Sequence, residues 1–229
     1  MKEFLYKFAF KEIQCLFEGK KVIICDLGGV LIDLHIDRSF AALVGLGVDS
    51  AILTERNCLM NGYMMQFDRG DISKEEMFAY MASSIPVAAR ERLGTELESA
   101  LQAIWNMMLG SYAPYKFRRI QELREQGYRV VILSNTNDGH WGELERLFQE
   151  TMGEPMQNFF DAFYLSYRMH RRKPEREIFL ELLKAEGVEP SDCIFFDDSA
   201  ENCDAARAVG IDAVLMERNA AWSKELMED

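Results

Sequence analysis

A short apolar run that ends in an aspartate constrains the fold of this chain more than any other feature. The run covers residues 22–25, Val-Ile-Ile-Cys, and Asp26-Leu27-Gly28-Gly29 follows at once. Its length suits a buried strand and is far below the roughly 20 apolar residues that a membrane span needs. Because open α/β sheets bind their ligands outside the carboxyl ends of the strands, the pattern predicts an aspartate at a ligand-binding edge.

The same pattern recurs near the C-terminus, where the apolar residues 193–196 run directly into Asp197-Asp198. Further strands are predicted over residues 128–133, 162–167 and 212–216. Helices are predicted to begin at Pro114 and at Lys173-Pro174, and to end at Gly127 and Gly187. Alternating strands and helices, with strands apolar along their whole length, are typical of a parallel sheet covered on both faces. The predicted fold class is therefore α/β.

The segment from about Asp37 to Leu109 differs from the rest, because its periodicity is helical throughout, for example over residues 74–81 and 90–107. An all-helical insertion directly after the Asp26 strand would overhang the sheet edge as a lid, with hinges at residues 33–36 and at Gly110. The predicted division is an N-terminal amphipathic helix over 1–20, a core formed by 21–36 and 110–229, and a helical cap over 37–109.

Composition narrows the partners. The net charge of −12 argues against nucleic acid or an anionic membrane surface, because both favour positively charged proteins. Five scattered cysteines without a C-x-x-C pair indicate a reduced, cytoplasmic protein without structural zinc. Charged residues interrupt the first twenty residues, which therefore read as an amphipathic helix rather than a secretory signal. The sequence leaves the oligomeric state and the role of that helix open.

Four groups follow predicted strands or open a predicted helix: Asp26, Ser134-Asn135, Lys173 and Asp197-Asp198. Each alone has a structural explanation, such as a turn or a helix cap. Together they predict one site, where like-charged carboxylates about 4 Å apart would repel by about 4 kcal/mol per pair at an effective dielectric near 20. A divalent cation relieves this repulsion, and oxygen ligands suit Mg²⁺.

This set of residues predicts phosphoryl chemistry. Asp26 can attack phosphorus and form an aspartyl-phosphate. Ser134 and the amide of Asn135 can donate hydrogen bonds to the phosphoryl oxygens, and Lys173 can neutralise their charge. We therefore expect an enzyme, a Mg²⁺-dependent phosphatase that acts on a small phosphorylated metabolite.

These motifs resemble the haloacid dehalogenase superfamily of aspartate-nucleophile hydrolases over residues 21–216. The resemblance is closer to the bacterial α-D-glucose-1-phosphate phosphatases and the phosphatase domain of soluble epoxide hydrolase, through residues 69–73, 123–137, 172–175 and 195–198. It implies a Rossmann-like core with a helical cap inserted after the first motif. It also implies a metal site made by Asp26, the carbonyl of Gly28 and Asp198, with Asp197 adjacent.

One position departs from the superfamily. In most phosphatases of the superfamily that this chain resembles, a second aspartate lies two residues after the nucleophile and acts as general acid and base. This chain has Gly28 at that position. A general acid contributes about 10²–10⁴-fold. The α-D-glucose-1-phosphate phosphatase branch, which this chain resembles more closely, also has glycine at this position. The absence of the aspartate favours a substrate with an easily displaced leaving group, such as a hexose-1-phosphate. Alternatively, a cap residue or an ordered water supplies the proton, or the chain is a non-catalytic phosphate-binding module.

Other reactions of the superfamily fit less well. Gly28 argues against a phosphomutase, because that reaction needs a group that protonates and deprotonates sugar hydroxyls. A phosphonatase of this superfamily uses a cap lysine as a Schiff base, and the only cap lysine, Lys74, is expected at a solvated helix start. A dehalogenase would not need the paired Asp197-Asp198 as a metal motif. Two segments remain ambiguous between packing or solvation and substrate contact, namely the cluster Met60, Tyr63, Met64, Met65 and the basic turn His170-Arg171-Arg172.

Overall fold

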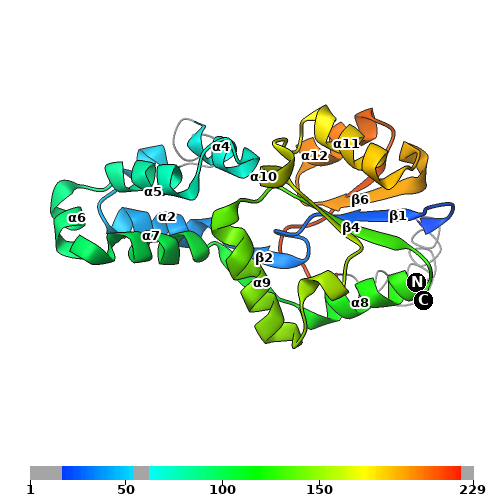
Figure 1. Cartoon of the computed structure of the whole chain (residues 1–229), viewed down its shortest axis with the longest axis horizontal. Coiled ribbons are helices and arrows are strands. Elements are labelled where there is room, and N and C mark those ends of the chain that lie inside the picture. Colours follow the sequence, from blue (N-terminus) through cyan, green and yellow to red (C-terminus); the bar gives the residue numbers. More distant parts are fainter. Residues whose placement is uncertain (1–16, 54–61, 223–229) are drawn as a thin grey trace, which may run out of the picture.

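The structure is a computed structural model that describes residues 17–53 and 62–222. It consists of an α/β core and a helical cap that projects from one side of it (Figure 1). Most of the predicted N-terminal helix, residues 1–16, lies outside the described residues. No helix in the described part of the chain is long and apolar enough to cross a membrane.

The core contains a five-stranded sheet, as predicted, and all of its pairings are parallel. Its strands, in spatial order, are β5 Ala162–Leu165, β4 Arg129–Ser134, β1 Val22–Cys25, β6 Cys193–Asp197 and β7 Asp212–Leu215. Cys25, the last residue of β1, pairs with Ile132 of β4 and Phe196 of β6. The three central strands therefore end almost level, which brings the residues after them to one edge.

Helices cover both faces of the sheet (Figure 1). Alternate side chains of β1 point to opposite faces, so Ile23 packs in one cluster and Ile24 in the other. The first cluster includes residues of α8 Pro114–Glu125 and α9 Asp138–Met152, and the second includes residues of α11 Arg176–Glu186 and α12 Ala200–Ala208. This confirms the predicted fold class, a Rossmann-like parallel sheet with helices on both sides.

Several predicted boundaries differ from the structure, and the following three differ most. The strand predicted over 162–167 ends at Leu165, and α10 Ser166–Met169 follows without a loop. The helix expected to open at Lys173 begins at Arg176 instead, after a cis Lys173–Pro174 peptide. The single helix predicted over 90–107 is divided into α6 Val87–Leu93 and α7 Leu97–Asn106 at Gly94, whose φ of +52° does not continue a helix.

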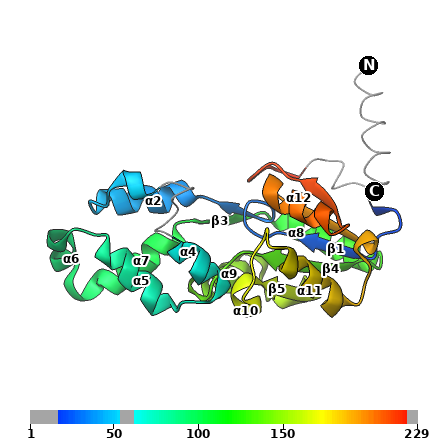
Figure 2. The same ribbon diagram turned by 90° about the horizontal axis from the view of Figure 1, so that it is seen from above.

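The cap is formed by α2 Ile36–Gly45, α4 Tyr63–Arg69, α5 Lys74–Ser83, α6 and α7. These helices bury their own hydrophobic cluster around Trp105, separate from the two clusters of the core. A capping box between Ser73 and Glu76 starts α5. Figure 2 shows that the cap and the core lie side by side along the long axis of the molecule.

A two-stranded antiparallel sheet connects the cap to the core. It pairs β2 Ile32–Leu34 with β3 Leu109–Tyr112, at the two places where hinges were expected. The sequence analysis found no strand signal here and missed both strands. Gly110 is required for their close approach, because a Cβ atom on it would lie 2.6 Å from the Cβ of Asp33.

Candidate active site

Asp26 lies at the end of β1 and is almost fully buried. Its Oδ1 accepts hydrogen bonds from the Leu27 amide at 2.7 Å and from Lys173 Nζ at 2.8 Å. Its Oδ2 accepts none from any residue that the structure describes. The carboxylate is therefore fixed through one oxygen, and the other remains available for chemistry.

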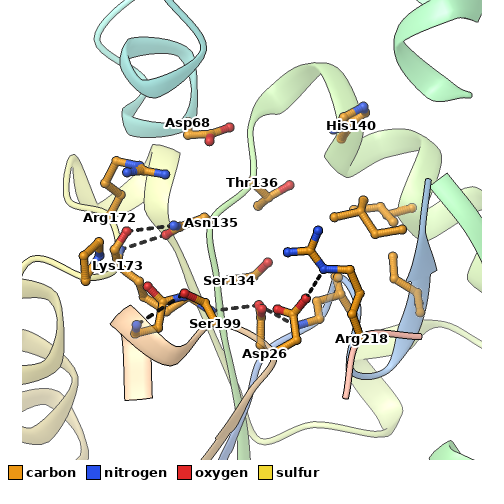
Figure 3. A pocket seen from close by; sticks show the side chains of 18 of the residues that line it. Asp26, Asp68, Ser134, Asn135, Thr136, His140, Arg172, Lys173, Ser199 and Arg218 are labelled. Carbon is orange, nitrogen blue, oxygen red and sulfur yellow. Dashed lines mark hydrogen bonds and ion pairs between the residues drawn. The ribbon is translucent and has the colours of Figure 1, made fainter. Parts of the chain in front are cut away.

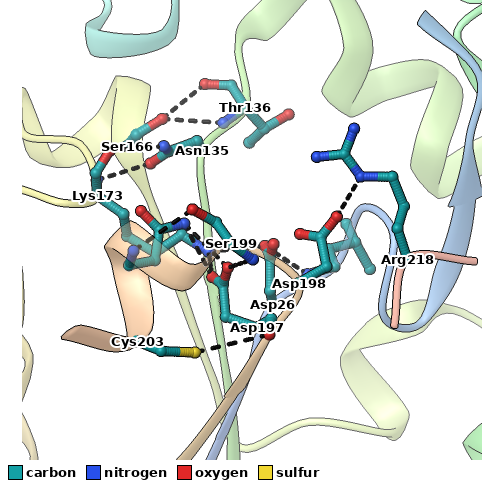
Figure 4. Close-up of polar contacts among 12 residues, drawn as sticks. Asp26, Asn135, Thr136, Ser166, Lys173, Asp197, Asp198, Ser199, Cys203 and Arg218 are labelled. Carbon is teal, nitrogen blue, oxygen red and sulfur yellow. Dashed lines mark hydrogen bonds and ion pairs between the residues drawn. The ribbon is translucent and has the colours of Figure 1, made fainter. Parts of the chain in front are cut away.

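Lys173 is buried between two carboxylates. Its Nζ lies 2.8 Å from Asp26 Oδ1 and 2.7 Å from Asp197 Oδ2 (Figure 4). Burial alone would lower the pKa of the lysine, but the attraction of Asp197 and Asp26 outweighs it and the pKa rises. The Asn135 side chain holds the lysine backbone, accepting from its N–H at 2.8 Å and donating to its carbonyl at 2.9 Å. Asn135 thus positions Lys173.

Asp197 has both carboxylate oxygens engaged. Oδ1 accepts from the Ser199 amide at 2.8 Å and from Asn202 Nδ2 at 3.0 Å, while Oδ2 accepts from Lys173 and Asn202. Ser199 in turn caps α12. Asp197 therefore fixes the lysine to the start of this helix and lies beneath the site rather than in its wall.

Three carboxylates meet at this edge. Oxygens of Asp26, Asp197 and Asp198 lie within 4.8 Å of one another. Burial raises the pKa of Asp26 to about 7, Lys173 opposes this rise, and the charges of Asp197 and Asp198 add to it. Oxygen donors carrying excess negative charge are the set that Mg²⁺ prefers, so the residues present fit the predicted ion.

Gly29 makes room for this carboxylate cluster. Its φ is +82°, and a Cβ atom on it would lie 2.6 Å from Asp198 Oδ2. The same Asp198 oxygen accepts a hydrogen bond from Arg218 Nε, which follows β7. The glycine is therefore required both by the backbone and by the position of Asp198.

A cavity of about 300 Å³ opens above the edge, between core and cap (Figure 3). Its lining contains most of the predicted site residues, namely Asp26, Gly28, Ser134, Asn135, Lys173 and Asp198. Of the ambiguous segments, Met64 and Arg172 line the cavity. Met65 is half exposed, Tyr63 stacks on Tyr80 at 3.9 Å between ring centroids, and Met60 lies outside the described residues.

Seven further polar residues line the cavity that the sequence analysis did not predict as site residues: Asp68, Thr136, His140, Ser199, Glu201, Asn202 and Arg218. Three of them, Ser199, Glu201 and Asn202, lie at the start of α12. Arg218 comes shortly after the last strand. The pattern that predicted Asp26 and Asp198, a polar residue just after an apolar strand, would have identified it too. Thr136 follows Ser134-Asn135 in the same loop. Asp68 and His140 lie in helices, α4 and α9, where no single-chain pattern distinguishes a site residue from a packed polar one.

Sequence comparison identifies relatives over almost the whole chain. The profile of haloacid dehalogenase-like hydrolases matches residues 20–210. The D-ribitol-5-phosphate phosphatase of Bacteroides thetaiotaomicron is 28% identical over 90% of this chain and 96% of its own length. The sesquiterpene phosphatase of Aspergillus oryzae is 25% identical over 91% of this chain and 95% of its own length. These names support the predicted class, a hydrolase acting on phosphoric monoester bonds.

Solved structures agree with this result. A haloacid dehalogenase family enzyme from B. thetaiotaomicron, crystallised with magnesium and inorganic phosphate, has a TM-score of 0.75 at 32% identity. The structural match covers 90% of this chain and 98% of the chain of that enzyme. A haloacid dehalogenase-like hydrolase from Porphyromonas gingivalis has a TM-score of 0.73 at 28% identity over 89% of this chain and 94% of its own. The finer resemblance to glucose-1-phosphate phosphatases stays a prediction, but the chain belongs to the haloacid dehalogenase-like hydrolase family.

Proposed function

We propose that this enzyme is a Mg²⁺-dependent phosphatase that hydrolyses a small sugar or sugar-alcohol phosphate through an aspartyl-phosphate on Asp26. The observation that carries the proposal is the asymmetric binding of Asp26, whose Oδ1 is held by two donors while Oδ2 is left open. A hexose-1-phosphate was favoured by the sequence, and the similarity to a D-ribitol-5-phosphate phosphatase adds a linear polyol phosphate to the candidates.

In the first half-reaction an Asp26 oxygen attacks phosphorus, the ester P–O bond breaks, and the alkoxide leaves as the alcohol after taking a proton from a water molecule in the cavity. In the second, water attacks phosphorus, the bond to Asp26 breaks, inorganic phosphate leaves, and the proton of the attacking water returns to the hydroxide left by the first step. Lys173 faces the nucleophile and neutralises phosphoryl charge, and Ser134 lines the same cavity with a hydroxyl that can donate to a phosphoryl oxygen.

We propose that Asp26, Asp198 and the Gly28 carbonyl hold the magnesium ion, which would supply charge neutralisation at the phosphoryl group. Asp197 was predicted next to these ligands. Because its oxygens already accept from Lys173, Ser199 and Asn202, we assign it to positioning the lysine. The enzyme crystallised with magnesium and phosphate supports the ion, and the carboxylate cluster supports its place.

The test is hydrolysis of phenyl phosphate with Mg²⁺ and with a chelator. We expect turnover that vanishes on chelation and in Asp26→Asn. Asp204→Asn, an exposed aspartate of α12 that pairs with Arg207, is the matched control and should retain full activity. Phosphate binding without any turnover would instead show the alternative, a non-catalytic module.

A further inference from the structure

We infer that Asp68 and His140 form an acceptor subsite that recognises hydroxyl groups on the leaving group of the substrate. The inference rests on the proposed phosphatase activity and names the class of its leaving group, a polyol. The subsite lies on the cap side of the cavity, across from Asp26 (Figure 3).

Asn137 binds both members of the subsite. Its Nδ2 donates to Asp68 Oδ1 at 3.0 Å, and its Oδ1 accepts from the His140 amide at 3.1 Å. The same Oδ1 also accepts from Trp105 Nε1 at 3.3 Å. Asn137, almost completely buried at the start of α9, therefore ties together the core and two helices of the cap.

The tautomer of His140 follows from its partner. Its Nε2 lies 3.0 Å from the Trp105 carbonyl, which can only accept, so Nε2 carries the proton and Nδ1 is an acceptor. Burial lowers the pKa of His140 to about 4, so the ring is neutral at physiological pH. Nδ1 has no hydrogen-bond partner among the described residues, and it retains some solvent-accessible surface. It is therefore accessible in a residue that lines the cavity.

Asp68 supplies the second acceptor. Its backbone carbonyl accepts from Ser166, and its Oδ1 from Asn137, so the residue is fixed at two points. Its Oδ2 has no partner in the described part of the chain and is not sealed from solvent. Burial raises the pKa of Asp68 to about 6, opposed by Asn137 and Arg172, which leaves the carboxylate mostly ionised at neutral pH.

Two fixed acceptors select a ligand with donors. A hydroxyl group satisfies them, whereas an aromatic ring or a second phosphate would leave them unpaired or repelled. Phe67 and Trp105, which pack beside this network, are fully buried and keep the acceptors in place. A leaving group that reaches from Asp26 to the subsite of Asp68 and His140 should therefore carry hydroxyl groups several atoms away from the ester oxygen.

The experiment compares kcat/KM for D-ribitol 5-phosphate and glucose 1-phosphate with kcat/KM for phenyl phosphate, all with Mg²⁺. We expect Asp68→Asn and His140→Leu each to lower the value for the better polyol phosphate about tenfold, the effect of one lost hydrogen bond. Phenyl phosphate, whose ring cannot donate to either acceptor, should not be hydrolysed more slowly by the variants, and its hydrolysis therefore reports on folding. Asp71→Asn, an exposed aspartate three residues from Asp68, is the control and should change neither substrate.

The outcomes separate this inference from the proposed function. If the natural protein hydrolyses none of the three phosphates with Mg²⁺, the proposed function itself is wrong. If it hydrolyses them, but both variants act on polyol and phenyl phosphates in the natural protein's ratio, the acceptor subsite is wrong and the phosphatase assignment stands. Asp68→Asn alone decides the matter if His140→Leu fails to fold.

Discussion

Gly28 and Gly29 are adjacent in the loop after β1, but the structure imposes opposite limits on a side chain at the two positions. A Cβ atom on Gly28 would meet only Leu34 side-chain atoms, at 3.5 Å and 3.8 Å, which is ordinary contact. A Cβ atom on Gly29 would overlap Asp198. The first glycine is therefore free to vary on steric grounds, and the second is not.

Gly28→Asp should consequently fold and add the general acid that the sequence lacks at this position. We expect kcat on an alkyl phosphate, whose leaving oxygen needs a proton, to rise by at least about tenfold, within the range for general acid catalysis. Phenyl phosphate, a better leaving group, should gain less. Steady-state kinetics on both substrates checks this, and equal changes on the two would contradict the proposed reason for the glycine.

Gly29→Ala should damage the proposed metal site. The left-handed backbone costs a residue with a Cβ atom about 1–3 kcal/mol, and the methyl group must also displace Asp198. We expect a lower melting temperature and weaker Mg²⁺ binding by calorimetry. Gly142→Ala, at an exposed position in α9 with no neighbouring atom within 4 Å, is the control and should melt at the same temperature or higher.

His140 should make stability depend on pH. Its pKa falls from 6.5 to about 4 on folding, so between these values the unfolded chain binds more protons and stability decreases as pH falls. The loss approaches on the order of 3 kcal/mol at pH 4. Urea unfolding of the natural protein and His140→Leu from pH 4.5 to 7.5 measures it. A constant difference between the two proteins would contradict the buried neutral ring.

Residues that end strands could be predicted from the sequence, and residues that meet through the fold could not. Asp26, Ser134 and Asp198 each follow an apolar run, so the parallel sheet alone brings them together. Asp68 is held by Asn137, 69 positions away, and by Ser166, 98 positions away. No local pattern marks such a partner, because its surroundings come from another part of the chain.

At the scale of elements, the cap contacts the core through more than its two connecting strands. Helix α4 packs against α10, where Ser166 donates to the Asp68 carbonyl, and Arg69 at the end of α4 pairs with Glu175 at the start of α11. Gly70 ends α4, and a Cβ atom on it would lie 2.4 Å from the Tyr167 carbonyl. This second junction fixes the position of Asp68 over the cavity.

Ser166→Ala should loosen this junction. The Ser166 hydroxyl accepts from the Thr136 amide at 2.9 Å and donates to the Asp68 carbonyl, and the residue is fully buried. Leaving the amide without an acceptor costs about 1–3 kcal/mol. We expect a lower free energy of unfolding and faster hydrogen exchange in α4, whereas Ser99→Ala, an exposed serine of α7, should change neither. Unchanged exchange in α4 would show that the other contacts suffice.

Element prediction succeeded for the five core strands and for the helices whose start or apolar stripe is marked in the sequence, such as α8 and α11. It missed α9, which at 15 residues is the longest helix in the described part of the chain, and it missed short segments. Strands β2 and β3 have only three and four residues, and their pairing rather than their composition defines them. The break at Gly94 was missed because the apolar spacing continues on both sides of it.

At the scale of the molecule, the core and the cap each bury a hydrophobic cluster, and the polar cavity lies where they meet. The chain carries a net charge of −12, and three carboxylates are concentrated at the sheet edge that forms the floor of this cavity. The repulsion there acts against folding in the absence of a cation, so the active site is expected to be a place where binding and stability are coupled.

Magnesium should therefore stabilise the whole fold through this edge. An ion that binds only the folded state at 100 times its Kd contributes about 2.7 kcal/mol. We expect Mg²⁺ to raise the melting temperature of the natural protein but hardly that of Asp198→Asn, which removes one charge of the cluster. Sodium chloride at equal ionic strength is the control, because general screening of a chain with a charge of −12 would act on both proteins alike. If sodium chloride reproduces the shift, or Asp198→Asn shows it in full, the stabilisation does not come from an ion held at this edge.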